Sequence, residues 1–177
     1  MARASSLQSQ AQGVEQGRLR DLYIRHARDA RGLAYLLTGD HGLAEDLAQE
    51  AFARVAGRLT HLRDPDAFPS YLRRTVVNLV RSNARRQRIE RAYLRQEEAS
   101  RTKEQEVEYD LDIREDLWRA LLRLPHRQRA AIILHYYRDV SESEASAILR
   151  CRPGTYRSLV ARGMRTLRDH MVGELHA

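Results

Sequence analysis

Apolar residues recur at three- and four-residue intervals along nearly the whole chain, and this spacing constrains the fold more than any other feature. The first run comprises Leu19, Leu22, Tyr23, Ala27, Ala30, Leu33, Leu36 and Leu37. An α-helix has about 3.6 residues per turn, so residues at these intervals lie on one side of it. The alternation typical of half-buried strands is absent. The sequence therefore predicts an all-α fold.

Turn signals divide the helical pattern into two sets. Breaks fall at residues 38–40 and 63–66, and Asp66 is a candidate helix N-cap. In the second set, Pro125 opens a helix, and Ser141 with Glu144 forms a capping-box pattern before a short helix. We expect two small helical domains joined by a charged linker. The expected segments are a flexible arm over 1–14, an N-terminal domain over 15–98, a linker over 99–109 and a C-terminal domain over 110–177.

Composition excludes several classes of protein. Hydrophobic residues make up 42% of the 177, too many for a chain kept disordered by low hydrophobicity. The sequence has neither an apolar run long enough for a membrane span nor a secretory signal, so we expect a cytoplasmic protein. Cys151 is the one cysteine, the seven histidines lack metal-ligand spacing, and no glycine-rich phosphate loop is present. We therefore expect no enzyme activity, no cofactor and no metal.

Positive charge is concentrated in two stretches. The net charge is +7, and Lys103 is the one lysine, so arginine carries nearly all of it. Residues 73–103 contain ten basic and three acidic residues, and residues 150–168 contain six arginines and no acid. Residues 104–116 between them are acidic. The pattern fits two nucleic-acid contacts, although two solvated helix faces or a genome rich in arginine codons would also produce it.

The last two expected helices form a helix-turn-helix pattern. A short capped helix and the turn at 150–152 precede a longer basic helix that starts at Pro153. Residues near the start of such a helix face base edges in the major groove. The candidates are Gly154, Thr155, Arg157, Ser158 and Arg162. Tyr156 and Val160 are expected to point inward, and an ordinary basic helical hairpin remains an alternative.

Two separate stretches resemble the sigma-70 family of transcription initiation factors. The C-terminal match is Leu124-Pro125-His126-Arg127-Gln128-Arg129, Tyr136-Tyr137-Arg138-Asp139, Ser141-Glu142, Gly154-Thr155 and Arg162-Gly163. The N-terminal match consists of Leu36–Asp40 followed by Ala44–Phe52, and of Ala67–Arg74 with Val77-Asn78-Leu79. The order and spacing, and the lack of a middle domain, are similar to those of the small extracytoplasmic-function (ECF) group.

The resemblance implies roles for particular residues. Those implied to bind core RNA polymerase, at its β′ clamp helices, are Asp40, Glu45, Asp46, Gln49 and Glu50. Those implied for −10 DNA are Arg63, Asp64, Phe68, Arg73, Arg74, Asn78, Arg81, Arg85 and Arg86. Those implied for −35 DNA are Thr155, Arg157, Ser158 and Arg162. Contact with the polymerase β flap and an anti-sigma partner are also implied. The alternative for the acidic cluster is a solvated helix face. The alternative for Phe68 and Tyr71 is a position in the core, and we favour it for Tyr71.

Five positions depart from the family pattern. Arg150 replaces a glycine in the turn, Arg152 replaces a capping serine, and Ala145 replaces a larger aliphatic residue. Leu159 stands where an arginine is common, which predicts a lost DNA contact, and Ala56 stands where an aromatic is frequent. We therefore expect weaker −35 selectivity, and Leu159→Arg to tighten DNA binding.

The sequence thus predicts an RNA polymerase sigma factor that is not an enzyme. One alternative is a one-component helix-turn-helix regulator, which would bind duplex DNA as a dimer without polymerase. Another is a diverged sigma-like protein that holds polymerase without selecting promoters.

Overall fold

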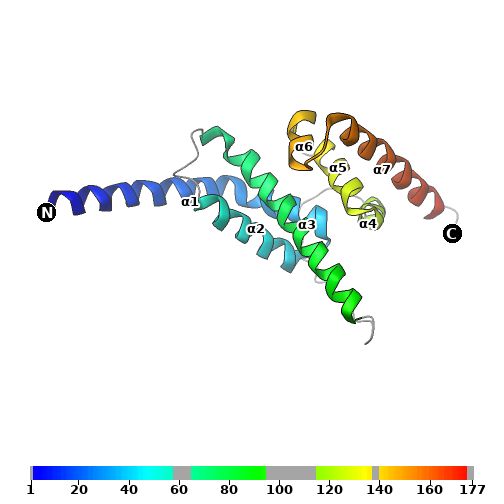
Figure 1. Cartoon of the computed structure of the whole chain (residues 1–177), viewed down its shortest axis with the longest axis horizontal. Helices are drawn as coiled ribbons and strands as arrows, with labels where there is room; N and C mark the ends of the chain where they lie inside the picture. The colour runs from blue at the N-terminus through cyan, green and yellow to red at the C-terminus, as the bar shows by residue number, and fades with distance from the viewer. Residues whose placement is uncertain (1, 58–64, 95–114, 137–139, 175–177) are drawn as a thin grey trace.

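The structure is a computed structural model, and it describes residues 2–57, 65–94, 115–136 and 140–174. Every regular element within these ranges is helical, which confirms the predicted all-α class. The N-terminal half contributes α1 (Ala2–Thr38), α2 (His41–Ala56), the 3₁₀ turn η2 (Pro65–Ala67) and α3 (Phe68–Leu94). The C-terminal half contributes α4 (Glu115–Arg123), α5 (His126–Tyr136), α6 (Glu142–Ile148) and α7 (Pro153–Glu174) (Figure 1).

A tight turn at Gly39 sets the corner between α1 and α2. Its φ of 77° lies in the left-handed region, which glycine adopts without the steric cost of a Cβ. Asp40 then caps α2, since its carboxylate accepts a hydrogen bond from the backbone N–H of Leu43 at 2.9 Å. The turn at Gly39 and the cap at Asp40 together fix where α2 begins.

Helices α1, α2 and α3 pack together in the N-terminal half. The buried face of α2 consists of Ala44, Leu47, Ala48, Ala51, Phe52 and Val55. On α3, buried residues recur at helical spacing from Phe68 to Val80, whereas none of residues 81–90 is buried. The second part of α3 therefore projects beyond the body of the protein (Figure 1).

The C-terminal half contains the expected helix-turn-helix, formed by α6 and α7. Beneath it, α4, α5 and α7 enclose a small cluster of Ala120, Leu121, Leu124, Ile132 and Leu167. Gly163 on α7 is buried, and a Cβ at that position would lie 2.8 Å from the Cδ1 atom of Ile132. A glycine there allows α7 to approach α5 closely.

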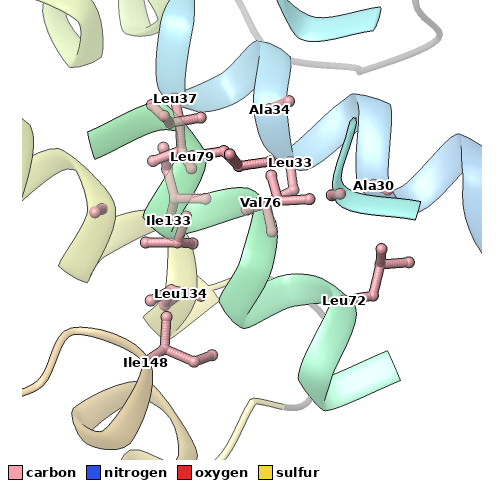
Figure 2. Packing of buried hydrophobic residues seen from close by; sticks show 14 of the residues in the cluster. Ala30, Leu33, Ala34, Leu37, Leu72, Val76, Leu79, Ile133, Leu134 and Ile148 are labelled. Atoms are coloured by element: carbon pink, nitrogen blue, oxygen red, sulfur yellow. The ribbon is translucent and has the colours of Figure 1, made fainter. Parts of the chain in front are cut away.

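The two halves share much of one core. Ile133 and Leu134 of α5 and Ile148 of α6 belong to the same buried cluster as Leu33 of α1 and Val76 of α3 (Figure 2). At a second seam, the ring of Trp118 on α4 stacks on Tyr35 of α1, with centroids 4.6 Å apart. Tyr35 in turn stacks on His41 at 3.9 Å. The C-terminal half is thus docked on the N-terminal one, where the sequence suggests separate cores.

The start of the chain also differs from expectation. Helix α1 begins at Ala2, so residues 2–14 are helical, whereas their composition predicts a flexible arm over 1–14. Residues 2–14 contain no proline, so the helix is not blocked there, but they form no apolar face that would have predicted it. The expected linker over 99–109 lies outside the described residues.

Candidate nucleic-acid and partner interfaces

The acidic side chains expected to bind a protein partner lie on the outer face of α2. Asp46, Gln49 and Glu50 are exposed, and Glu45 is half-buried. Asp40 is also exposed, but one of its carboxylate oxygens is engaged in capping the helix. The structure therefore brings all five predicted residues together on α2 and the corner before it.

Two of these acids already have basic partners within the chain. Glu45 accepts hydrogen bonds from Arg31 at 3.1 Å and from Gln49 at 3.0 Å, and Glu50 accepts one from Arg54 at 2.5 Å. Such pairs at partly exposed positions contribute about 0–1 kcal/mol, so a partner with arginines can replace them. Asp46 makes no comparable contact within the described residues. It presents the least engaged carboxylate of the cluster.

Two aromatic residues near the start of α3 differ in burial. Phe68 is 0% exposed and packs beside Phe52, with ring centroids 6.0 Å apart. Tyr71 is 50% exposed. The buried ring of Phe68 fits the core position that the sequence left open as the alternative, and its −10 role stays a prediction. The favoured core position of Tyr71 is wrong, because its ring is available to solvent.

Basic side chains follow the outer surface of α3. Arg74, Arg81, Arg85, Arg86 and Arg88 are exposed. Asn78 is half-buried. The arginines lie along a helix that leaves the protein body after Val80, which suits contact with a phosphate backbone. Arg63 and Asp64, also predicted for −10 DNA, lie outside the described residues.

Arg73 does not lie free on that surface. Its Nε and a terminal nitrogen both donate to one carboxylate oxygen of Glu144 on α6, at 3.1 and 2.6 Å. The two side chains are 26% and 23% exposed. The sequence does not indicate this pair, because 71 residues separate its members. It joins the basic helix of one half to the helix-turn-helix of the other.

Helix α7 presents the predicted −35 residues on its outer face. Thr155, Arg157, Ser158 and Arg162 are exposed, and Arg157 donates to Glu142 of α6 at 2.8 Å. On the inner face, Tyr156 is 1% exposed, and its hydroxyl donates to the backbone oxygen of Ala131 at 3.4 Å. The inward orientation predicted for Tyr156 is confirmed.

Leu159 is a core residue. It is 9% exposed and belongs to the main buried cluster with Tyr156, three residues earlier on the same side of α7. The prediction that Leu159→Arg would add a DNA contact is therefore wrong, because the position faces the protein interior. An arginine there would bury a charge without a partner.

The turn before α7 carries backbone strain. Arg150 has a φ of 50°, in the region where the family's glycine would be unstrained. Before α6, the side-chain oxygen of Ser141 accepts a hydrogen bond from the Glu144 backbone N–H, as the capping box predicts. Ala145 is fully buried and Cys151 half-buried against the main cluster. Cys151 therefore fits a packing role.

A half-buried histidine marks the seam between the halves. Burial, and then the neighbouring Arg129, Arg81 and Arg127, lower the pKa of His126 from 6.5 to about 4. Its Nε2 atom is buried and has no hydrogen-bond partner within the described part of the chain. Sequence periodicity does not reveal this site, because Arg81 comes from α3 and His126 from α5.

Other kinds of site are not indicated by the described residues. They contain no cluster of three or more histidine, cysteine or acidic side chains placed to hold a metal ion. Among the described helices, none combines the length and apolar character that a membrane span requires.

Comparison with known families gives two matches, in the same order as the two halves. Residues 22–89 match the family model described as Sigma-70 region 2. Residues 114–167 match the model described as Sigma-70, region 4. The first match covers the last 17 of the 37 residues of α1, all of α2 and η2 and most of α3, and the second covers α4, α5, α6 and most of α7.

Several curated proteins are similar over most of this chain. The ECF RNA polymerase sigma factor SigE of Mycolicibacterium smegmatis is 33% identical over 156 residues, which cover 85% of this chain and 60% of that protein. The RNA polymerase sigma-E factor of Streptomyces coelicolor is 30% identical over 151 residues, covering 85% and 84%. Among solved structures, the sigma factor RpoE from Bartonella quintana, crystallised with the anti-sigma factor NepR, matches with a TM-score of 0.72. It is 25% identical and covers 86% of this chain and 95% of that one.

Proposed function

The chain belongs to the ECF group of the sigma-70 family, and from this premise we propose that it directs RNA polymerase to promoters by the surfaces described above. Members of this family are transcription initiation factors without enzymatic activity. The observation that carries the proposal is the joint presence of an acidic face on α2 and arginine-bearing faces on α3 and α7. A sigma factor needs one protein-binding and two DNA-binding surfaces, and it acts where polymerase does, in the cytoplasm.

The acidic face of α2 is the proposed contact with the β′ clamp helices. Carboxylates accept charge-assisted hydrogen bonds from arginines, and such bonds are stronger than neutral ones. Asp46 is the most available acceptor, whereas Glu45 and Glu50 would exchange Arg31 and Arg54 for partners on polymerase. The C-terminal half is proposed to contact the β flap.

The start of α3 is the proposed reader of the −10 element. Tyr71, rather than Phe68, offers an exposed ring on which an unpaired base can stack. Arg74, Arg81, Arg85 and Arg86 would contact phosphates, which supplies affinity with little sequence information. Arg63, Asp64, Arg73 and Asn78 remain proposed −10 contacts, and for Arg73 this requires release from Glu144.

Helix α7 is the proposed reader of the −35 element. Its exposed face carries Thr155, Arg157, Ser158 and Arg162, and an arginine can contact a guanine through two hydrogen bonds. The strained turn at Arg150 leaves this helix in place, which supports the proposal that it still docks on DNA.

An anti-sigma factor is a further proposed partner. The similar structure of RpoE was determined in complex with the anti-sigma factor NepR. A protein that bound both halves of the present chain would cover its polymerase- and DNA-binding surfaces.

Polymerase binding provides the first test. Replacing Glu45, Asp46 and Glu50 together by alanine removes three acceptors while keeping good helix formers on α2. We expect loss of binding to core polymerase in a pull-down, with unchanged helical content by circular dichroism. The matched control replaces the exposed acids Asp21, Glu90 and Asp169 by alanine, which removes the same charge from α1, α3 and α7. Equal binding by both triple variants would rule out α2 as the contact.

Run-off transcription then separates the remaining alternatives. A sigma factor supports initiation by core polymerase at discrete sites on genomic fragments. A one-component regulator would bind duplex DNA without polymerase and leave the α2 acids without a role. A diverged sigma-like protein would bind polymerase but give no discrete transcripts.

A further inference from the structure

The first turn of α6 is in contact with an arginine from each of the two proposed DNA-binding surfaces. Glu144 accepts two hydrogen bonds from Arg73 of α3, and Glu142 accepts one from Arg157 of α7. Both arginines are proposed DNA contacts, and both acids lie within three residues of one another on a capped helix. An acidic oxygen held between guanidinium nitrogens is chemically similar to a DNA phosphate oxygen.

We propose that this turn, Glu142 to Glu144, acts as an internal substitute for DNA phosphate and keeps the free protein closed. The inference rests on the proposed function, since it assigns a state to the same DNA-binding surfaces. In the closed state Arg73 is engaged by Glu144, and the proposed −10 surface is therefore incomplete. The Arg157 pair is more exposed, at 70% and 43%, so it restrains α7 less than the Arg73 pair restrains α3.

Promoter geometry requires this contact to break. The −10 and −35 elements lie about 25 base pairs apart, which is roughly 85 Å at about 3.4 Å per base pair. A 22-residue helix such as α7 is about 33 Å long. While Arg73 and Glu144 are 2.6 Å apart, the helix-turn-helix cannot reach one element as α3 contacts the other. The arrangement in Figure 1 is therefore a resting state, and the promoter-bound state is an open one.

The buried contacts around the pair make the closed state more than a surface ion pair. Ile148, on the same short helix as Glu144, is buried in the cluster that contains Val76 of α3 (Figure 2). On the other side of the seam, Trp118 is stacked on Tyr35. Opening exposes these apolar groups, so binding of core polymerase must stabilise the open state. The ion pair between Glu144 and Arg73 adds an electrostatic contact to this apolar interface between the halves.

The test uses the full chain with two substitutions at Glu144. Glu144→Gln removes the charge, and Glu144→Asp keeps the charge but shortens the side chain so that it no longer spans to Arg73. We expect both to increase the affinity of the free protein for a short fluorescein-labelled duplex of mixed sequence, by about three- to tenfold in fluorescence anisotropy. Amide hydrogen exchange in α6 and in the first part of α3 should rise in both variants.

Controls separate the proposal from a general charge effect. Glu90→Gln removes an exposed acid from α3 without touching α6, and it should change the affinity much less. In complex with core polymerase, the Glu144 variants should bind a promoter duplex as the unmodified protein does, since the halves are already apart. An affinity gain no larger than that of Glu90→Gln, together with unchanged binding by Glu144→Asp, would overturn the proposal. Failure of the unmodified protein to bind core polymerase would instead reject the proposed function.

Discussion

At the scale of single residues, burial assigns different roles to two aromatic side chains three positions apart. Tyr71→Ala is expected to weaken binding of single-stranded −10 DNA to the polymerase complex by about 1–3 kcal/mol, because a stacking surface is lost. Its free energy of unfolding should change little, since the ring is half-exposed. Phe68→Ala should instead lower the free energy of unfolding by about 3–5 kcal/mol. Anisotropy with a labelled oligonucleotide and urea unfolding measure the two effects, and a destabilised Tyr71 variant would contradict the assignment.

Arg150 is the second informative residue, because its backbone is strained. A residue with a Cβ in the left-handed region lowers the free energy of unfolding by about 1–2 kcal/mol. Glycine removes this strain, but its greater freedom in the unfolded chain offsets about 0.5–1 kcal/mol of the gain. Arg150→Gly is therefore expected to raise the free energy of unfolding by about 0.5–1 kcal/mol in chemical denaturation. Arg150→Ala, which keeps a Cβ at the same positive φ, serves as the control. An equal gain in both variants would show that strain at Arg150 is not the cause.

At the scale of elements, α3 combines a buried first part with a basic projecting part. Replacing Arg81, Arg85 and Arg86 by glutamine should weaken DNA binding by the polymerase complex similarly across promoters. Each lost phosphate contact reduces the magnitude of the slope of log K against log salt concentration by about 0.7–0.9. The slope of the triple variant should therefore be smaller by about 2–3. The control replaces the exposed Arg18, Arg20 and Arg25 of α1 in the same way. A salt slope equal to that of the control would mean that α3 does not contact phosphates.

Most elements could be predicted from local signals, and their chemistry explains why. The capping serine at 141 and the proline at 153 mark where α6 and α7 begin, because each acts within a few residues of itself. The acids on α2 lie one helical turn apart, so their shared face also follows from the sequence. The helical start of α1 was less apparent, since its composition lacks an apolar face and tertiary packing usually decides such segments.

At the scale of the whole molecule, the arrangement of the halves could not be predicted. Periodicity shows that Leu33 and Ile133 face an interior, but it does not show that they share one cluster. The pair between Arg73 and Glu144 depends on that arrangement, as does the exposure of Tyr71. The predicted surfaces on α2, α3 and α7 thus followed from sequence, whereas the contacts that close the molecule required the structure.

The seam between the halves should make stability depend on pH through His126. Its pKa is about 4 in the folded protein and 6.5 when unperturbed, because burial and then Arg129, Arg81 and Arg127 disfavour its cationic form. Between these values the unfolded chain binds more protons than the folded protein. The free energy of unfolding therefore rises with pH in this range, and the protein loses stability as pH falls from about 6.5 to 4. At about 1.4 kcal/mol per pKa unit, the loss attributable to His126 is about 3 kcal/mol.

The measurement is urea unfolding of the protein and of His126→Gln at several pH values. Above pH 7 the two should share the same pH dependence, because the histidine is neutral in both states. Below 6.5 the variant should lose less stability, since glutamine takes up no proton. Protonation also adds a fourth cation beside three arginines from both halves, so acid should separate the halves before either unfolds. Parallel curves for the two proteins down to pH 4 would show that His126 is not the group at the seam that responds to acid.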